Sequence, residues 1–298
     1  MKKKDTISIV VASDNHYAIL IVALLKSIDV NHTSGEHIIF YIIDDGIAAS
    51  FRPELESIVD PERITIKWFK SKNVIPSTMY IPVDKSSFPL TTYLRLFSPY
   101  LVEEGTDRLL YLDVDIIVQD DISKLWNINL EGNVIGVVQD VGLTFDCEWG
   151  GVPNYAELGF PADTKYFNAG VMLMDLKIWR EENITEKVIR ALIDNRQHVR
   201  LVDQYGLNVV LANRWKQLDP HWNWFAYQEE DNASLIHFLD IKPIFKSYNS
   251  QPVYKEYFFK YLEMTPWKNF KPISGNSRRF RKIYNKLKKA VMRLLSNK

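Results

Sequence analysis

The feature that most constrains the fold is a series of short apolar segments that show no alternation of polar and apolar residues. They occupy residues 7–12 (ISIVVA), 38–43 (IIFYII), 64–69, 109–118 and 134–138. Segments with helical character separate them, at residues 17–30, 51–59 and 91–100. Strands that are apolar on both faces and alternate with helices predict a parallel α/β sheet that is covered on both sides.

The pattern changes after Asp140. Residues 142–166 are rich in glycine, proline and aromatic residues, which predicts a long loop of the kind that often has a function. A further strand is expected at residues 167–176, and helices at 176–182, 185–195 and 203–211.

Acidic residues gather where the predicted strands end. They are Asp14, Asp44, Asp113, Asp115 and Asp140. Ligands of open α/β sheets bind beyond the carboxyl ends of the strands. We therefore expect a ligand site at this edge of the sheet.

Asp113 and Asp115 stand inside the apolar run YLDVDIIV (111–118), where an unpaired carboxylate is unfavourable. In an extended chain, residues i and i+2 point to the same side, so the two carboxylates would converge while Val114 turns into the core. A divalent cation such as Mg²⁺ or Mn²⁺ is the natural partner of such a pair. A pair of helix caps, or a salt bridge to Arg108, is the alternative.

Two later segments add candidate side chains. His237 lies in SLIHF (234–238) and could supply a third metal ligand, although a structural histidine is the commoner case. Lys242 follows five residues later and could neutralise a phosphate. In VDQYGLN (202–208), Asp203 is expected at the N-cap of a helix and Gln204 in its first turn, where it could face a substrate.

Composition limits the class of protein. The 298 residues are 46% hydrophobic and 25% charged, which is ordinary for a globular enzyme, and the zero formal charge gives no argument for a nucleic-acid partner. Cys147 is the only cysteine, so an intramolecular disulfide is impossible, which fits a reducing compartment. No uncharged segment approaches the roughly 20 residues that span a bilayer. We expect a cytoplasmic protein.

The C-terminal segment is basic, with no Asp or Glu after Glu263. In residues 277–298, apolar side chains follow helical spacing, and Lys and Arg fill the other face. This pattern predicts an amphipathic helix that binds an anionic membrane surface; a disordered tail, or a helix docked on the protein, is the alternative. If the helix is an anchor, deletion of residues 272–298 should move the protein from the membrane to the soluble fraction.

Six segments together resemble glycosyltransferase family 8, which includes glycogenin and bacterial lipooligosaccharide galactosyltransferases. They are VVASDNHY (10–17), TTYLRL (91–96), LLYLDVDIIVQDDISKLW (109–126), YFNAGVMLMDLKIW (166–179), VDQYGLN (202–208) and IHFLDIKP (236–243). They occur in the family's order. The resemblance implies a GT-A fold, which is a Rossmann-like, mostly parallel sheet with helices on both faces. It also implies a catalytic domain over residues 1–265, followed by the tail, residues 266–298.

The resemblance also implies roles for single residues. Asp113, Asp115 and His237 would hold Mn²⁺ or Mg²⁺, with Val114 between the two aspartates in the donor site, and Lys242 would touch the phosphates. Ala12, Asp14 and Tyr17 would lie against the uracil and ribose of a UDP-sugar. The residues around the transferred sugar would be Arg95, Asp140, Asn168, Ala169, Asp203 and Gln204. Among these, Gln204, Asp140 and Asp203 are the catalytic candidates.

The function that the resemblance implies is transfer of galactose or glucose from a UDP-sugar, with retention of anomeric configuration, to a lipid-linked or cell-surface glycan. Two alternatives remain. One is a protein that binds UDP-sugars without catalysis, because Asp240 and Ile244 replace the glycine and tryptophan that relatives often carry near the phosphates. The other is a sugar nucleotidyltransferase, which would need a Gly-rich, Arg-bearing loop where this chain has SDNHY (13–17).

Overall fold

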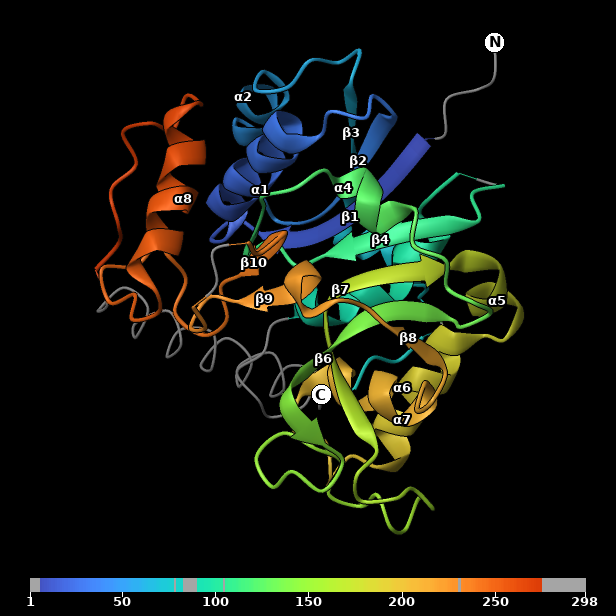
Figure 1. The fold of residues 1–298 in the computed structure, drawn as a ribbon. Coiled ribbons are helices and arrows are strands. Elements are labelled where there is room, and N and C mark those ends of the chain that lie inside the picture. Colours follow the sequence, from blue (N-terminus) through green and yellow to red (C-terminus); the bar gives the residue numbers. More distant parts are fainter. Residues whose placement is uncertain (1–5, 78, 83–89, 104, 230–231, 275–298) are drawn as a thin grey trace, which may run out of the picture.

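The computed structural model describes residues 6–77, 79–82, 90–103, 105–229 and 232–274. Its main sheet has seven strands in the order β3-β2-β1-β4-β7-β6-β8 (Figure 1). Their bounds are β1 (Thr6–Asp14), β2 (His37–Asp45), β3 (Ile64–Lys70), β4 (Arg108–Leu112), β6 (Ile135–Thr144), β7 (Lys165–Asp175) and β8 (Trp215–Gln217). A second sheet has three short strands in the order β5-β10-β9, namely β5 (Ile116–Val118), β10 (Leu235–His237) and β9 (Trp224–Phe225).

The predicted α/β sheet is confirmed, with one correction to its direction. Strands β3, β2, β1 and β4 are parallel to one another, but β7 runs antiparallel to both β4 and β6. β6 and β7 are consecutive strands that pair directly through a connection without a helix, so the second must run back along the first. The predicted loop is also shorter, because β6 continues to Thr144 and β7 starts at Lys165.

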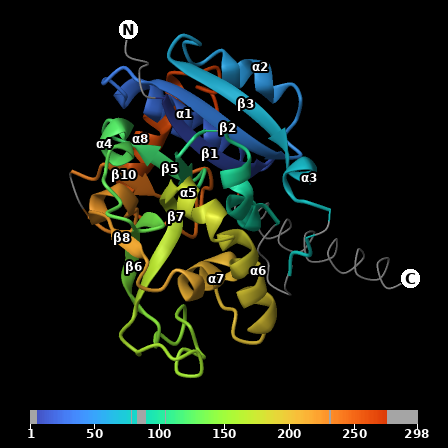
Figure 2. The same ribbon diagram turned by 90° about the vertical axis from the view of Figure 1, so that its right-hand side faces the viewer.

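Helices cover both faces of the sheet (Figures 1 and 2). The elements on one side are α1 (Ala18–Asn31), α2 (Phe51–Glu56), α4 (Ile122–Trp126) and α8 (Pro252–Glu263), and those on the other are α3 (Ser71–Val74), the 3₁₀ helix η1 (Leu90–Tyr100), α5 (Leu176–Glu181), α6 (Ile184–Asp194) and α7 (Val202–Val210). Strand β1 contacts both layers of helices. Its Ile7, Ile9 and Val11 belong to the hydrophobic cluster on one face of the sheet, and its Val10 and Ala12 belong to the cluster on the other. A strand that is buried on both faces has to be apolar throughout, as its sequence is.

One strand was expected within residues 109–118, with the two aspartates near its end, and the structure has two strands there. The chain bends at Asp113–Asp115, so that β4 belongs to the main sheet and β5 to the second sheet. The Asp113 N–H donates to the Gly170 carbonyl oxygen of β7 (2.7 Å), whereas the Asp115 carbonyl oxygen accepts from the Phe238 N–H after β10 (2.8 Å). The two aspartates are therefore fastened to different sheets.

Helix α1 fixes β5 from the side. The Val118 N–H donates to Ser27 Oγ, and the Val118 carbonyl oxygen accepts from Asn31 Nδ2, both at 2.9 Å. An edge strand has unpaired backbone groups, and these two side chains satisfy them.

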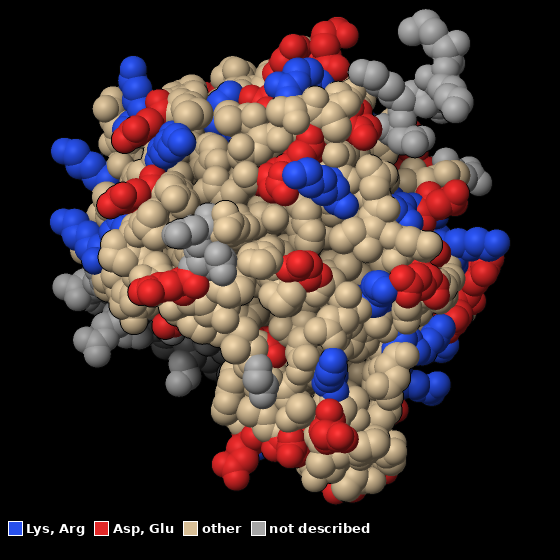
Figure 3. All heavy atoms as spheres, viewed as in Figure 1, with Lys and Arg blue, Asp and Glu red and all other residues tan. Residues whose placement is uncertain are grey.

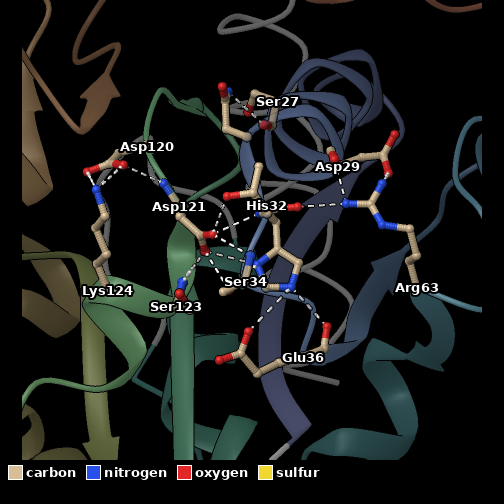
Figure 4. A network of polar contacts seen from close by, with 12 residues as sticks. Ser27, Asp29, His32, Ser34, Glu36, Arg63, Asp120, Asp121, Ser123 and Lys124 are labelled. Carbon is tan, nitrogen blue, oxygen red and sulfur yellow. Dashed lines mark hydrogen bonds and ion pairs between the residues drawn. The ribbon is translucent and has the colours of Figure 1, made fainter. Parts of the chain in front are cut away.

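Asp121 anchors the other end of this segment (Figure 4). Its carboxylate accepts from the N–H groups of Thr33 and Ser34 at 2.8 Å and from Ser123 at 3.0 Å, and it contacts His32 Nδ1 at 3.0 Å. Burial opposes ionisation, but the N–H groups of Ser123 and Thr33 outweigh it and hold the pKa of Asp121 well below its usual range. The end of α1 and the start of α4 are thereby joined through one carboxylate.

The surface shows no gathering of one charge on the face drawn in Figure 3. Basic and acidic side chains of the described residues are interspersed there, with wide uncharged areas between them. In the part of the chain that the structure describes, no helix is both long and apolar enough to span a membrane. The basic segment 277–298 lies outside the described residues, so its predicted helix stays a prediction.

The Asp121 contacts predict a clear effect on stability. Asp121→Asn turns one acceptor oxygen into a donor that faces other donors, and should lower the free energy of unfolding by roughly 3 kcal/mol. Asp120→Asn is the matched control, because Asp120 pairs with the largely exposed Lys124, and should change it by less than about 1 kcal/mol. Urea unfolding measures both. Equal effects of the two substitutions would contradict the role of Asp121.

Candidate active site

Asp113, Asp115 and His237 converge at the bend between the two sheets. One ligand atom from each lies within 4.8 Å of the other two. His237 Nε2 is 3.9 Å from Asp113 Oδ2 and 3.4 Å from Asp115 Oδ1, and the His237 side chain is 2% exposed. Two carboxylates and one imidazole could hold Mn²⁺ or Mg²⁺. The carboxylates converge through the bend rather than through the expected extended chain.

The ion pairs of the two aspartates differ from the predicted alternative. Arg108 donates to the Trp126 carbonyl oxygen, while Asp113 and Asp115 pair with Arg95 and Lys242, respectively. Val114 packs against the hydrophobic core, as expected from the sequence.

Asn223 sets the orientation of His237, and the sequence had not indicated it. Asn223 lies in the 3₁₀ helix η2 (Pro220–Asn223) and donates through Nδ2 to Asn168 Oδ1 (3.0 Å). Its oxygen therefore faces His237 Nδ1, at 2.9 Å, so this nitrogen carries the proton. Nε2 faces the aspartates, and a hydrogen bond that orients the ring through its other nitrogen is the usual arrangement of a metal-ligating histidine.

Gly170 allows the cluster to close. A methyl group at this position would lie 2.4 Å from His237 Cε1 and 3.0 Å from Asp113 Oδ2. The segment FNAG had been noted for Asn168 and Ala169, but the need for glycine appears only when β7 and β10 meet. The requirement is close approach, because the strand conformation itself tolerates any residue.

Arg95 is a buried cation next to the cluster. Its Nε is 2.8 Å from Asp203 Oδ2 and its Nη2 is 3.4 Å from Asp113 Oδ1, while its guanidinium carbon lies 5.0 Å from the centre of the Tyr111 ring. Its Nη1 donates to the Ala169 carbonyl oxygen. Burial opposes the positive charge, but Asp113 and Asp203 hold the pKa of Arg95 above its ordinary value.

Asp203 is not the N-cap that the sequence predicted. The capping position is Leu201, and Asp203 lies in the first turn of α7 with 1% of its surface exposed. Burial raises the pKa of Asp203 to about 6, against the opposing charge of Arg95. The side chain turns inward because the buried guanidinium needs a counter-charge. Val202, just before it, has φ +47°, a left-handed conformation that is strained for a β-branched residue.

Gln204 and Asp140 form a bonded pair beside Asn168 and Ala169. Gln204 Oε1 accepts from the Ala169 N–H (2.9 Å), and Gln204 Nε2 donates to Asp140 Oδ2 (3.3 Å). Asn168 Nδ2 donates to the same oxygen at 3.2 Å. Burial raises the pKa of Asp140, and these two amides counteract part of the rise. The residues predicted around a sugar are thus linked to one another by direct contacts.

Ala12, Asp14 and Tyr17 lie at the carboxyl end of β1, which is parallel to β4 and next to it in the sheet. Asp14 Oδ1 accepts from the N–H groups of His16 (2.8 Å) and Tyr17 (3.1 Å), so it shapes the start of α1. The His16 ring contacts Phe245, with 5.7 Å between ring centroids. This segment therefore shares the sheet edge with Asp113, and its His16 reaches the loop that carries Lys242.

The loop 238–245 holds Lys242 against the cluster. Lys242 Nζ pairs with Asp115 Oδ2 and donates to the Phe238 carbonyl oxygen (2.7 Å). Burial of Asp115 favours its neutral form, but Lys242 and His237 outweigh this and lower its pKa. Asp240 has φ +52°, the conformation that a glycine adopts readily and that aspartate tolerates, and Ile244 is fully buried in the core. Both departures from the family pattern are thus accommodated in the loop.

Comparison with known proteins decides the family. The sequence matches the family model described as "Glycosyl transferase family 8" over residues 8–246, a range that includes all the candidate site residues. The chain belongs to glycosyltransferase family 8.

Two curated proteins are similar to this chain over most of its length. General stress protein A of Bacillus subtilis (strain 168) is 28% identical over 289 residues, which span 90% of this chain and 96% of that protein. Lipopolysaccharide 1,2-glucosyltransferase of Escherichia coli (strain K12) is 27% identical over 268 residues, which span 83% of this chain and 75% of that protein.

Solved structures of LgtC establish the fold of this family 8 chain. An active-site glutamine-to-glutamate mutant of LgtC aligns with a TM-score of 0.72, and the galactosyltransferase in complex with donor and acceptor sugar analogs aligns with 0.70. Both are 22% identical and cover 87% of this chain and 96% of theirs. The fold is GT-A, as the resemblance in sequence implied.

Gly170 provides a test of the cluster. Gly170→Ala should lower the affinity for Mn²⁺ by about tenfold or more, because the methyl group displaces His237 from the aspartates. Gly150→Ala is the control, since its methyl group would meet Leu143 and Leu201 at 3.4 Å, an ordinary contact. Electron paramagnetic resonance of free Mn²⁺ measures both affinities. Unchanged affinity in Gly170→Ala would argue against a metal at this position.

Proposed function

We propose that this family 8 chain is a metal-dependent, retaining hexosyltransferase that uses a UDP-sugar. The observation that carries the proposal is the convergence of Asp113, Asp115 and His237 beside the buried groups of Arg95 and Gln204. One end of this site suits a divalent cation and a diphosphate, and the other presents buried hydrogen-bonding groups to a sugar.

The proposed metal is Mn²⁺ or Mg²⁺, and the donor set fits it. Asn223 holds the ring of His237 through Nδ1, so that Nε2 faces the two aspartates. When bound, the cation would act as a Lewis acid that stabilises the negative charge of the leaving UDP, an effect of several kcal/mol. Lys242 would add a second positive charge on the phosphate side.

Gln204 is proposed to line the reacting face of the sugar. Its amide oxygen is held by the Ala169 N–H, so it acts as a fixed dipole rather than as a nucleophile. An oxocarbenium-like transition state gains from such oxygens and from the nearby Asp140 carboxylate. We favour attack from the front face, in which an oxygen of the leaving phosphate takes the proton of the acceptor hydroxyl. Asp203 would act indirectly, by holding Arg95 in place.

The proposed donor is UDP-galactose or UDP-glucose, with Ala12, Asp14 and Tyr17 against the uracil and ribose. The lipopolysaccharide glucosyltransferase among the relatives supports a hexose donor and a glycan or glycolipid acceptor. We propose that residues 1–265 form the catalytic domain and that the tail, residues 266–298, holds the protein at the inner face of the plasma membrane. Within that second range, Trp267 packs on Phe51 and Ile273 pairs with Phe245, so the tail's first residues also contact the domain.

The decisive experiment is a panel of UDP-sugars with Mn²⁺, read by UDP release. We expect release from one hexose donor, slow without acceptor, that is lost with a chelator and reduced at least about 100-fold in Asp113→Asn. If the protein binds UDP-sugars but releases UDP from none of them, the result would favour the alternative, a protein that binds UDP-sugars without catalysis. UDP release that persists without metal would show that the reaction does not depend on a divalent cation.

Gln204→Ala tests the sugar side of the pocket. Loss of the fixed amide should slow transfer by about 100-fold while UDP affinity changes by less than about twofold, because Gln204 contacts the sugar end only. Gln197→Ala, at an exposed glutamine, is the control. Steady-state rates and calorimetry with UDP give the two quantities. Equal rates for Gln204→Ala and the wild type would exclude Gln204 from the mechanism.

A further inference from the structure

Lys242 and the candidate metal site share one carboxylate group, that of Asp115. Asp115 directs Oδ1 at His237 Nε2, 3.4 Å away, and its Oδ2 pairs with Lys242 Nζ. Both side chains are largely buried, with 17% of Lys242 and 12% of Asp115 exposed. Asp115 is therefore already neutralised by a cation that belongs to the protein.

A divalent cation and an ammonium group do not share a buried carboxylate easily. Two positive charges a few ångströms apart repel strongly where water is largely excluded, so each weakens the hold of the other on Asp115. A cation held by Asp113, Asp115 and His237 gains most if the ammonium group leaves. Arg95 does not play the same part, because its guanidinium is bound to Asp203 and to the Ala169 carbonyl oxygen as well.

The loop permits such a movement. The Phe238 N–H donates to the Asp115 carbonyl oxygen (2.8 Å) and the Ile244 carbonyl oxygen accepts from the Ile273 N–H (2.8 Å), so the backbone of the loop is held at both ends. The lysine side chain is a flexible four-carbon stem with a compact charge. Its ammonium group can thus move while the main chain stays in place.

We propose that Lys242 is an exchangeable counter-ion of Asp115, which a divalent cation displaces and which then moves onto the diphosphate of the nucleotide. This inference rests on the proposed function, because it assumes a metal and a diphosphate at this site. Its consequence is that cation and nucleotide bind cooperatively. The cation alone must displace Lys242 without compensation, whereas with the nucleotide present the displaced ammonium group gains the phosphates, and the coupling is reciprocal.

The test measures Mn²⁺ binding by electron paramagnetic resonance, with and without UDP, in the whole protein. Lys242→Met removes the charge and keeps the length of the side chain, and Lys242→Arg keeps a charge. Lys246→Met is the matched control, because this lysine lies in the same segment but is exposed. Thermal unfolding of each variant establishes that it is folded.

Without UDP, we expect Lys242→Met to bind Mn²⁺ about tenfold more tightly than the wild type or better, since a neighbouring charge shifts such an equilibrium by about one to three powers of ten. Lys242→Arg and Lys246→Met should bind as the wild type does. With UDP, the affinity of the wild type for Mn²⁺ should rise at least about tenfold, and that of Lys242→Met should rise much less.

Mn²⁺ affinity in Lys242→Met that equals or falls below that of the wild type, including no binding by either, would overturn the exchange. An equal gain in Lys246→Met would also overturn it, because the effect would then be general electrostatics. Cooperative Mn²⁺ and UDP binding in a protein that transfers no sugar would leave the exchange intact and overturn the proposed function instead.

Discussion

The site depends on the bend at which the main chain leaves one sheet and enters the other. Asp113 is fastened through its N–H to β7, and Asp115 through its carbonyl oxygen to the residue after β10, with Val114 alone between them. Backbone groups in such a position must be paired, so the bend cannot open without breaking both pairings. The two carboxylates are consequently placed by the backbone, and His237 follows because it pairs with Ile116 in the second sheet.

The buried carboxylates around this bend are balanced in two ways, some by cations and one by neutral amides. Arg95 forms ion pairs with Asp203 and Asp113, and Lys242 forms one with Asp115. Asp140 is bonded instead by the amides of Asn168 and Gln204, and burial raises its pKa. The ammonium group of Lys242 therefore lies where a diphosphate is proposed to bind, and the neutral amides of Asn168 and Gln204 lie where a sugar is proposed to react. Buried carboxylates that were not balanced in this way would be unfavourable for the fold.

The sequence predicted the layered architecture because a strand that is buried on both faces is apolar throughout. The apolar runs at residues 7–12, 38–43 and 134–138 lie within β1, β2 and β6, apart from Val134 just before β6. It did not predict that the run 109–118 divides between two sheets, since strands in both sheets are equally apolar. It also missed the reversed direction of β7, because a strand that is buried on both faces shows the same composition in either direction.

What the sequence determined by itself is the identity of the reactive groups and their family, since these reside in short contiguous motifs such as YLDVDIIV and VDQYGLN. Tertiary structure alone decided how they are arranged. Asp203, which was expected to cap a helix, pairs with Arg95 instead, and Asn223 accepts a hydrogen bond from His237. Gly170 is needed because a larger residue would prevent the approach of β7 to β10. The physical reason is that each of these contacts joins residues far apart in the chain. Their energy depends on burial and distance in the folded protein, which local sequence does not encode.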